Sequence, residues 1–199
     1  LMSAYSYNLS LPLIKDYKKT RNVLIPKISL RLSPHEMKNH TNTNRRITTN
    51  NVFSSNRLGL EDSFETGESI TLGLDFIKDK KNIVSEIAEM EEYFDFKLAT
   101  VFRLEEEKNI PTNSSLNKKT SNVFGQLNFK PNEIISLKYD FSLTNDLNTF
   151  EYNSMTSKFN FNNFSTEFTF LEERGKIGNS NIIENNTKYN FDEFNTISF

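Results

Sequence analysis

The sequence has no cysteine, no tryptophan and only two histidines, and these absences exclude several classes of site. Without cysteine there is no disulfide scaffold, no thiolate zinc site and no cysteine nucleophile. Six glycines and five prolines in 199 residues exclude collagen-like and Pro/Gly-rich disordered chains as well. The 24 Lys and Arg nearly balance the 26 Asp and Glu, so no basic excess favours nucleic acid as a partner.

Long apolar runs are missing too. The mean hydropathy is −0.59, and no stretch of about 18 apolar residues occurs. A transmembrane helix is therefore excluded, but a transmembrane β-barrel is not, because only every second residue of its strands faces lipid. The chain starts at Leu1 in an alternating segment, with no basic and apolar leader, so we expect it to be part of a longer protein.

What the chain does contain is a repeated alternation of apolar and polar residues. The run 135–143, for example, reads Ile-Ser-Leu-Lys-Tyr-Asp-Phe-Ser-Leu. A period of two places successive side chains on opposite faces of a β-strand, so the pattern predicts an all-β, antiparallel, up-and-down fold. We expect ten strands, at residues 4–15, 23–33, 69–78, 95–104, 121–129, 134–144, 150–161, 164–172, 187–191 and 196–199.

The polar half of this alternation carries full charges in the middle of strands. Strands of about 9–11 residues with one apolar and one charged face are typical of barrels that cross outer membranes, with lipid outside and water inside. A closed barrel also pairs every backbone N–H and C=O, which lipid requires. We therefore predict a transmembrane β-barrel whose lumen is faced by Lys97, Arg103, Lys138, Asp140 and Lys158.

The connections between the expected strands differ in length. Outer-membrane barrels have short periplasmic turns and long external loops, so we expect the long connections to be extracellular. The short ones are built of turn-forming residues, such as Lys-Pro-Asn-Glu at 130–133. Connection 79–94 is an exception: we interpret it as a solvated insertion, with a short periplasmic helix as the alternative, because Ile83, Ile87 and Met90 recur at helical spacing.

Several constellations that suggest chemistry do not meet its requirements. His35-Glu36 and His40 lack the spacing of a helical zinc motif, and neither histidine lies near a Gly-x-Ser-x-Gly elbow. The acidic run 105–107 is interpreted as solvated loop charge, with a divalent-cation or ligand-bridging role as the alternative. We therefore expect no catalytic residue, no metal site and no cofactor, and a protein that is not an enzyme.

Residues 23–76 carry a more specific pattern. A strand with a Pro-Lys pair is followed by a long loop that closes with Phe, Asn-Arg and two glycines. This segment resembles the barrel domain of the LptD family of lipopolysaccharide-assembly outer-membrane proteins. It departs from that family at Glu61-Asp62-Ser63, where relatives have Asp-Arg, so the basic residue is missing. The matching residues are Ile25-Pro26-Lys27, Ser33-Pro34, Asn51-Val52-Phe53, Asn56-Arg57-Leu58-Gly59, Glu61, Asp62, Glu65-Thr66-Gly67 and Gly73-Leu74.

The resemblance implies a fold and a function. It implies that residues 1–199 are part of one outer-membrane β-barrel domain, without the periplasmic N-terminal domain and the barrel ends. Ten strands hardly close the large barrel of that family, so we expect an open curved sheet or a partial barrel. The implied function is insertion of lipopolysaccharide into the outer leaflet of the Gram-negative outer membrane. The implied partners are lipopolysaccharide, outer-membrane lipid, an LptE-like lipoprotein plug in the lumen and a periplasmic LptA-like bridge.

The motif itself is interpreted as a loop anchor, with direct contact to lipid A phosphates or core sugars as the alternative. Its glycines allow backbone conformations that a Cβ disfavours, and its arginine has carboxylates nearby. The anchor residues are Phe53, Asn56, Arg57, Gly59, Glu61, Asp62, Glu65 and Gly67. Other functions remain open from the sequence: a porin-like or other barrel channel, a soluble β-sandwich binding module, or an outer-membrane enzyme such as a lipase, whose catalytic residues are missing.

Overall fold

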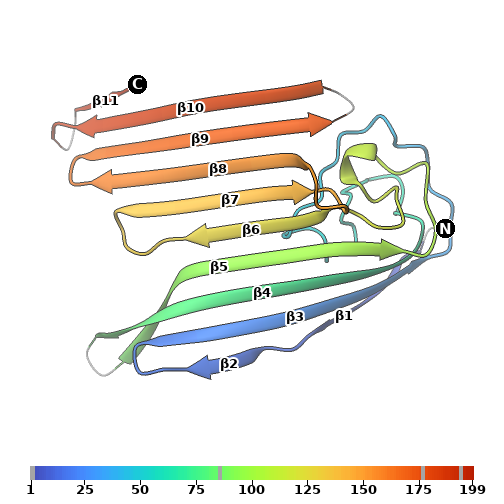
Figure 1. Cartoon of the computed structure of the whole chain (residues 1–199), viewed down its shortest axis with the longest axis horizontal. Coiled ribbons are helices and arrows are strands. Elements are labelled where there is room, and N and C mark those ends of the chain that lie inside the picture. Colours follow the sequence, from blue (N-terminus) through green and yellow to red (C-terminus); the bar gives the residue numbers. More distant parts are fainter. Residues whose placement is uncertain (1–2, 85–86, 176–177, 193–194) are drawn as a thin grey trace.

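The computed structural model describes residues 3–84, 87–175, 178–192 and 195–199. Apart from the 3₁₀ turn η1 (Thr112–Ser114), its regular elements are the strands of one antiparallel, up-and-down sheet (Figure 1). The described strands are β1 (Tyr5–Ser10), β2 (Leu13–Asp16), β3 (Thr20–Ser33), β4 (Gly67–Val84), β5 (Ile87–Arg103), β6 (Val123–Phe129), β7 (Ile135–Leu143), β8 (Phe150–Phe161), β9 (Phe164–Gly175), β10 (Gly178–Asn190) and β11 (Thr196–Ser198).

The eleven strands form an open, curved sheet that runs in chain order from β1 to β11 (Figure 1). The all-β, antiparallel prediction is confirmed, including its open form. The described strands make one sheet and not two facing sheets, so the alternative β-sandwich is wrong. Among the described residues, no helix is long and apolar enough to cross a membrane.

The first expected strand is divided in two. β1 and β2 both pair with β3, so the eleven strands occupy ten positions across the sheet. The division falls at Leu11 and Pro12: the Leu11 amide still donates to the Pro26 carbonyl at 3.1 Å, but Pro12 has no amide hydrogen to continue the ladder. The proline therefore breaks the strand without displacing it from its neighbour.

The strand register sorts side chains onto two faces, because directly paired residues in an antiparallel sheet share a face. One row across β1, β3, β4 and β5 is apolar, and the row beside it is polar. The apolar row is Tyr7, Leu30, Ile70 and Phe102, and the polar row is Ser6, Arg31, Ser69 and Arg103. We call these two surfaces the apolar face and the polar face; large side chains of the apolar face, such as Tyr7 (61% exposed) and Leu72 (43%), are open to the surroundings.

All five charged residues predicted for the lumen lie on the polar face. Lys97 pairs with Gln126, which pairs with Asp140. On β5, Arg103 lies six residues after Lys97, and on β7, Lys138 lies two residues before Asp140, so both share the polar face. Lys158 on β8 pairs with Ser136, which lies two residues before Lys138 on β7. The alternation of the sequence is thus converted into a common surface by the register.

Two expected connections are strands instead. The interpretation of 79–94 as an insertion or a short helix is wrong, because β4 and β5 pair as far as Val84 and Ile87. The long loop expected at 173–186 is also wrong, because β9 and β10 pair as far as Gly175 and Gly178. Both extensions lack the alternation that signals a strand: the first is charged on both faces, and a bulge between Lys78 and Asp79 shifts its phase.

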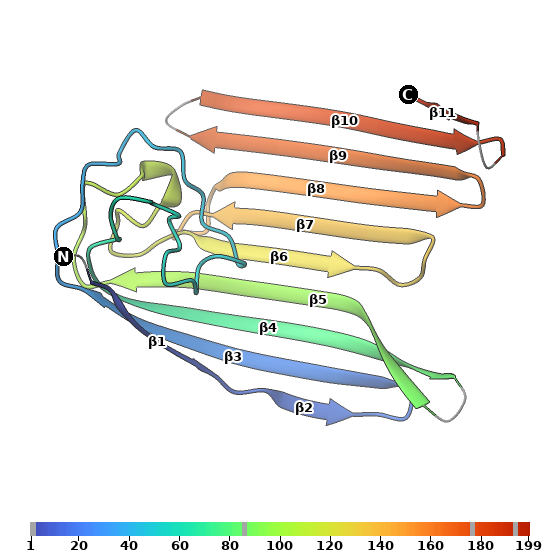
Figure 2. The ribbon, with the colours of Figure 1, turned by 180° about the vertical axis from the view of Figure 1, so that it is seen from behind.

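The buried core lies between the sheet and two long loops. Residues 34–66 connect β3 to β4, and residues 104–122 connect β5 to β6; both pack over one end of the polar face (Figure 2). Ala99, Val101 and Phe124 supply the sheet side of this core. The loop side consists of Met37, Ile47, Val52, Leu58, Leu60, Ile110 and Leu116.

A glycine on the apolar face gives a test of the packing. A Cβ built on Gly125 would lie 2.0 Å from the ring of Phe141, so the ring rests directly on the glycine backbone. We expect Gly125→Ala to destabilise the fold by about 1–3 kcal/mol, the usual cost of overpacking. The measurement is the midpoint of urea unfolding. In a Phe141→Ala background the same substitution should cost almost nothing, and an equal loss in both backgrounds would contradict the contact.

Candidate functional site

The motif residues Arg57 and Glu65 form a buried, bidentate ion pair within the 34–66 loop, on the side that faces the sheet. Arg57 Nε lies 2.6 Å from Glu65 Oε2, and Arg57 Nη2 lies 2.6 Å from Oε1. Both side chains are only 2% exposed. The guanidinium also donates to Thr71 Oγ1 at 2.9 Å and to Ser69 Oγ at 3.0 Å, both on β4. The loop is thereby fixed to the polar face of the sheet.

Glu65 is shared by a second arginine. Arg103, at the end of β5, donates to Glu65 Oε1 and to the Thr66 carbonyl, and its side chain is 3% exposed. A third arginine, Arg31 on β3, is 7% exposed and donates to the Ser55 carbonyl. One carboxylate therefore balances three buried guanidinium groups.

The electrostatic state of Glu65 follows from these neighbours. Burial by itself raises the pKa of the Glu65 carboxyl. The positive charges of the arginines and the hydrogen bonds from Arg57 outweigh this effect, so the pKa lies below its ordinary value of 4.5. Glu65 is thus held in its charged form.

The other motif residues shape the loop backbone. Asn56 closes a tight turn on Leu60: its Oδ1 accepts from the Leu60 amide at 3.2 Å, and its Nδ2 donates to the Leu60 carbonyl at 2.9 Å. Gly59 sits inside this turn with φ +60°, a conformation that favours glycine. Phe53 lies on the backbone of Gly73 in β4, where a Cβ would come within 2.5 Å of the ring.

The remaining motif residues lie elsewhere. Asp62 does not contact Arg57: it is exposed and pairs with Lys38 at 2.8 Å and with His40 at 3.3 Å. Glu61 is exposed, and no ion pair with it occurs among the described residues. Gly67 begins β4 with φ +88°, next to the Arg103 guanidinium. The structure thus brings Arg57 and Glu65 together and leaves Glu61 and Asp62 at the surface.

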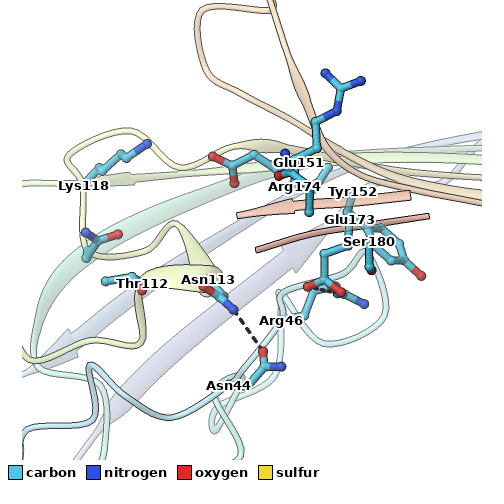
Figure 3. A pocket seen from close by; sticks show the side chains of 13 residues that line it. Asn44, Arg46, Thr112, Asn113, Lys118, Glu151, Tyr152, Glu173, Arg174 and Ser180 are labelled. Atoms are coloured by element: carbon cyan, nitrogen blue, oxygen red, sulfur yellow. Dashed lines mark hydrogen bonds and ion pairs between the residues drawn. The ribbon is translucent and has the colours of Figure 1, made fainter. Parts of the chain in front are cut away.

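A second feature of the polar face is a cavity of about 340 Å³ between the two loops and the strands β7–β10 (Figure 3). Arg46, in the 34–66 loop, pairs with Glu173 on β9 at 2.6 Å and stacks on the Tyr152 ring of β8 at 3.8 Å. Asn113 of the other loop donates to Asn44 at 3.3 Å. These contacts hold both loops over the cavity.

This cavity was not predictable from the sequence. Arg46, Tyr152 and Glu173 belong to no motif, and more than 100 residues separate Arg46 from the strands that it contacts. They come together because Tyr152 and Glu173 are paired on the polar face and the 34–66 loop places Arg46 above them.

The histidines do not form a common site. His35 Nε2 lies 3.1 Å from Ser3 Oγ, and His40 Nε2 lies 2.8 Å from Ser63 Oγ. Within the described part of the chain, no group of three His, Cys, Asp or Glu side chains could hold a metal ion. What the polar face offers a ligand is therefore hydrogen-bonding groups and charges.

The chain matches a known protein family over nearly its whole length. The model of the family LptD, described as LPS transport system D, matches residues 1–195. The chain belongs to this family. A search of curated proteins found no match. The match covers nearly the whole chain and confirms the resemblance seen in residues 23–76, so LptD membership associates the protein with lipopolysaccharide transport.

The shared carboxylate provides a mutational test. Glu65→Gln removes the negative charge that Arg57 and Arg103 share, and breaking a buried pair in this way costs about 3–5 kcal/mol. We expect the 34–66 loop to detach and trypsin to cleave it at Arg45 or Arg46. The matched control is Asp62→Asn, which removes a carboxylate that is itself exposed and contacts only Lys38 and His40 among the described residues, so the cleavage rate should stay unchanged. Equal protection of the loop in both variants would contradict the anchor.

Acid should weaken the same contact. Because the folded pKa of Glu65 lies below its unfolded value of 4.5, the stabilisation is complete above that value and is lost as the pH falls through the lowered folded pKa. We expect the melting temperature of the wild type, followed by circular dichroism, to fall more steeply below pH 4.5 than that of Glu65→Gln. Parallel curves for the two proteins would show that another group is responsible.

Proposed function

We propose that this protein inserts lipopolysaccharide into the outer leaflet of the Gram-negative outer membrane, as part of an LptD-type transmembrane β-barrel. The observation that carries the proposal is the separation of the two faces of one sheet. Membership of the LPS transport system D family supports the same substrate.

The apolar face supports a membrane location. Its exposed Tyr, Leu, Ile and Phe side chains would cost free energy in water, at roughly 25 cal/mol per Å² of apolar surface, but none in hydrocarbon. The ends of the sheet differ as the termini of outer-membrane strands do: tight connections such as 162–163 lie at one end, and the 34–66 and 104–122 loops lie at the other. We place these long loops on the extracellular side.

The polar face would then line the barrel lumen. Its charged residues, among them Lys97, Lys138 and Lys158, suit water or a polar occupant. In the proposed assembly this occupant is an LptE-like lipoprotein plug, and an LptA-like bridge delivers the lipopolysaccharide from the periplasm. Residues 1–199 would form part of one barrel domain.

In this function the Arg57–Glu65 contact acts as a loop anchor. It would hold the 34–66 loop against the lumen wall, so that the loop restricts the extracellular mouth. The same arrangement requires no covalent chemistry from the barrel, which is therefore proposed to be a transporter component and not an enzyme.

Depletion of the full-length protein in its host tests the proposal. We expect newly made lipopolysaccharide to disappear from the cell surface, measured by labelling of intact cells, and to return when the wild-type gene is restored. Surface lipopolysaccharide that is unchanged after complete depletion would refute it. The channel alternative predicts instead that the purified protein conducts ions in planar bilayers and that depletion lowers solute uptake while surface lipopolysaccharide stays normal.

A further inference from the structure

The cavity between the loops and β7–β10 has an unusual lining for its size. Its volume of about 340 Å³ lies in the range of small-ligand sites, which are usually lined by apolar side chains. Among the described residues that line it, Tyr152 is the one aromatic residue, and none is Ala, Val, Leu, Ile or Met. Seven lining side chains are instead amides or hydroxyls: Asn44, Thr112, Asn113, Asn117, Ser142, Asn179 and Ser180.

This lining selects the chemistry of a ligand. An amide both donates and accepts hydrogen bonds, and so does a hydroxyl, so these groups match a ligand that also carries many donors and acceptors. An acyl chain in the cavity would leave these amides and hydroxyls without hydrogen-bond partners. The lining thus favours a hydroxyl-rich ligand.

The charges around the cavity favour a neutral ligand over an anion. Arg46 already pairs with Glu173 at 2.6 Å. Arg174 pairs with Glu172 at 2.7 Å, and Glu151 accepts from Asn122 at 2.6 Å. Among the charged lining residues, this leaves Lys118 as the cation for which the described residues show no such partner. Most of the charge is thus neutralised within the protein, whereas the amides and hydroxyls are available in number.

We propose that this cavity is a saccharide-binding site that takes the oligosaccharide portion of lipopolysaccharide. The inference rests on the proposed function, since it assumes that lipopolysaccharide passes this face of the sheet. Asn113 and Asn44 project from the two loops, and Ser180 from β10, so a sugar in the cavity would contact the loops and the sheet wall together (Figure 3).

A steric substitution tests the site. The probe is the lipid-free oligosaccharide released by mild acid from the host's own lipopolysaccharide, titrated into the full-length protein in detergent and followed by calorimetry. Ser180 is exposed, so Ser180→Trp should fill the cavity without disturbing the core, and we expect the dissociation constant to rise at least about tenfold. Asn113→Ala, which removes one hydrogen-bonding group, should raise it about threefold to tenfold.

The matched control is Asn186→Trp. Asn186 is exposed on the same strand and the same face as Ser180, about 20 Å further along, outside the cavity. Unchanged affinity in this control, together with the loss in Ser180→Trp, supports the site. Equal loss in both tryptophan variants, or wild-type protein that does not bind the oligosaccharide, overturns it. If the wild-type protein does not bind the oligosaccharide but its depletion still removes lipopolysaccharide from the cell surface, only the saccharide site is refuted. If depletion leaves surface lipopolysaccharide unchanged, the proposed function is refuted as well.

Discussion

Cross-strand register is the constraint on which the rest of this structure depends. In an antiparallel pair, a shift of one residue would move every side chain to the other face, so the register alone keeps Arg31 and Arg103 on one surface and Leu30 and Phe102 on the other. The 34–66 loop then packs on the polar face, where it contacts Ser69, Thr71 and Gly73 of β4. Without this separation there would be neither a lipid-compatible surface nor a wall for the cavity.

The Glu65 carboxylate is the second element of this arrangement. Surface ion pairs contribute little to stability, but a buried carboxylate that two guanidinium groups share cannot be removed without leaving buried charge unpaired. The carboxylate joins the loop residue Arg57 to Arg103 on β5, and Arg57 in turn donates to Ser69 on β4, so the pair connects three segments. The loop is therefore part of the polar face and not an appendage to it. This fixed loop forms one wall of the cavity near β8 and β9.

Strands were predictable wherever the two faces differ in polarity. β7 could be located because Leu137, Tyr139 and Phe141 alternate with polar residues. β10 was recognised only at its end, since Asn181, Asn185 and Thr187 are polar on the face that is apolar elsewhere. The ends of β4 and β5 were missed for a related reason, as charges such as Asp79 and Lys80 occupy both faces. Pairing with a neighbouring strand, which supplies backbone hydrogen bonds whatever the side chains, formed these parts.

The candidate site divides in the same way. By itself the sequence determined the two-faced strands and the anchor motif, because a period of two and a local spacing of Asn, Arg and Gly are readable along a single chain. Only the tertiary structure decided that Arg57 takes Glu65 and not Asp62, that Arg103 shares this carboxylate, and that Arg46 reaches Tyr152 and Glu173. Choices between equally close carboxylates, and contacts across more than 100 residues, depend on burial and on the path of the loops, and neither is written in the local sequence.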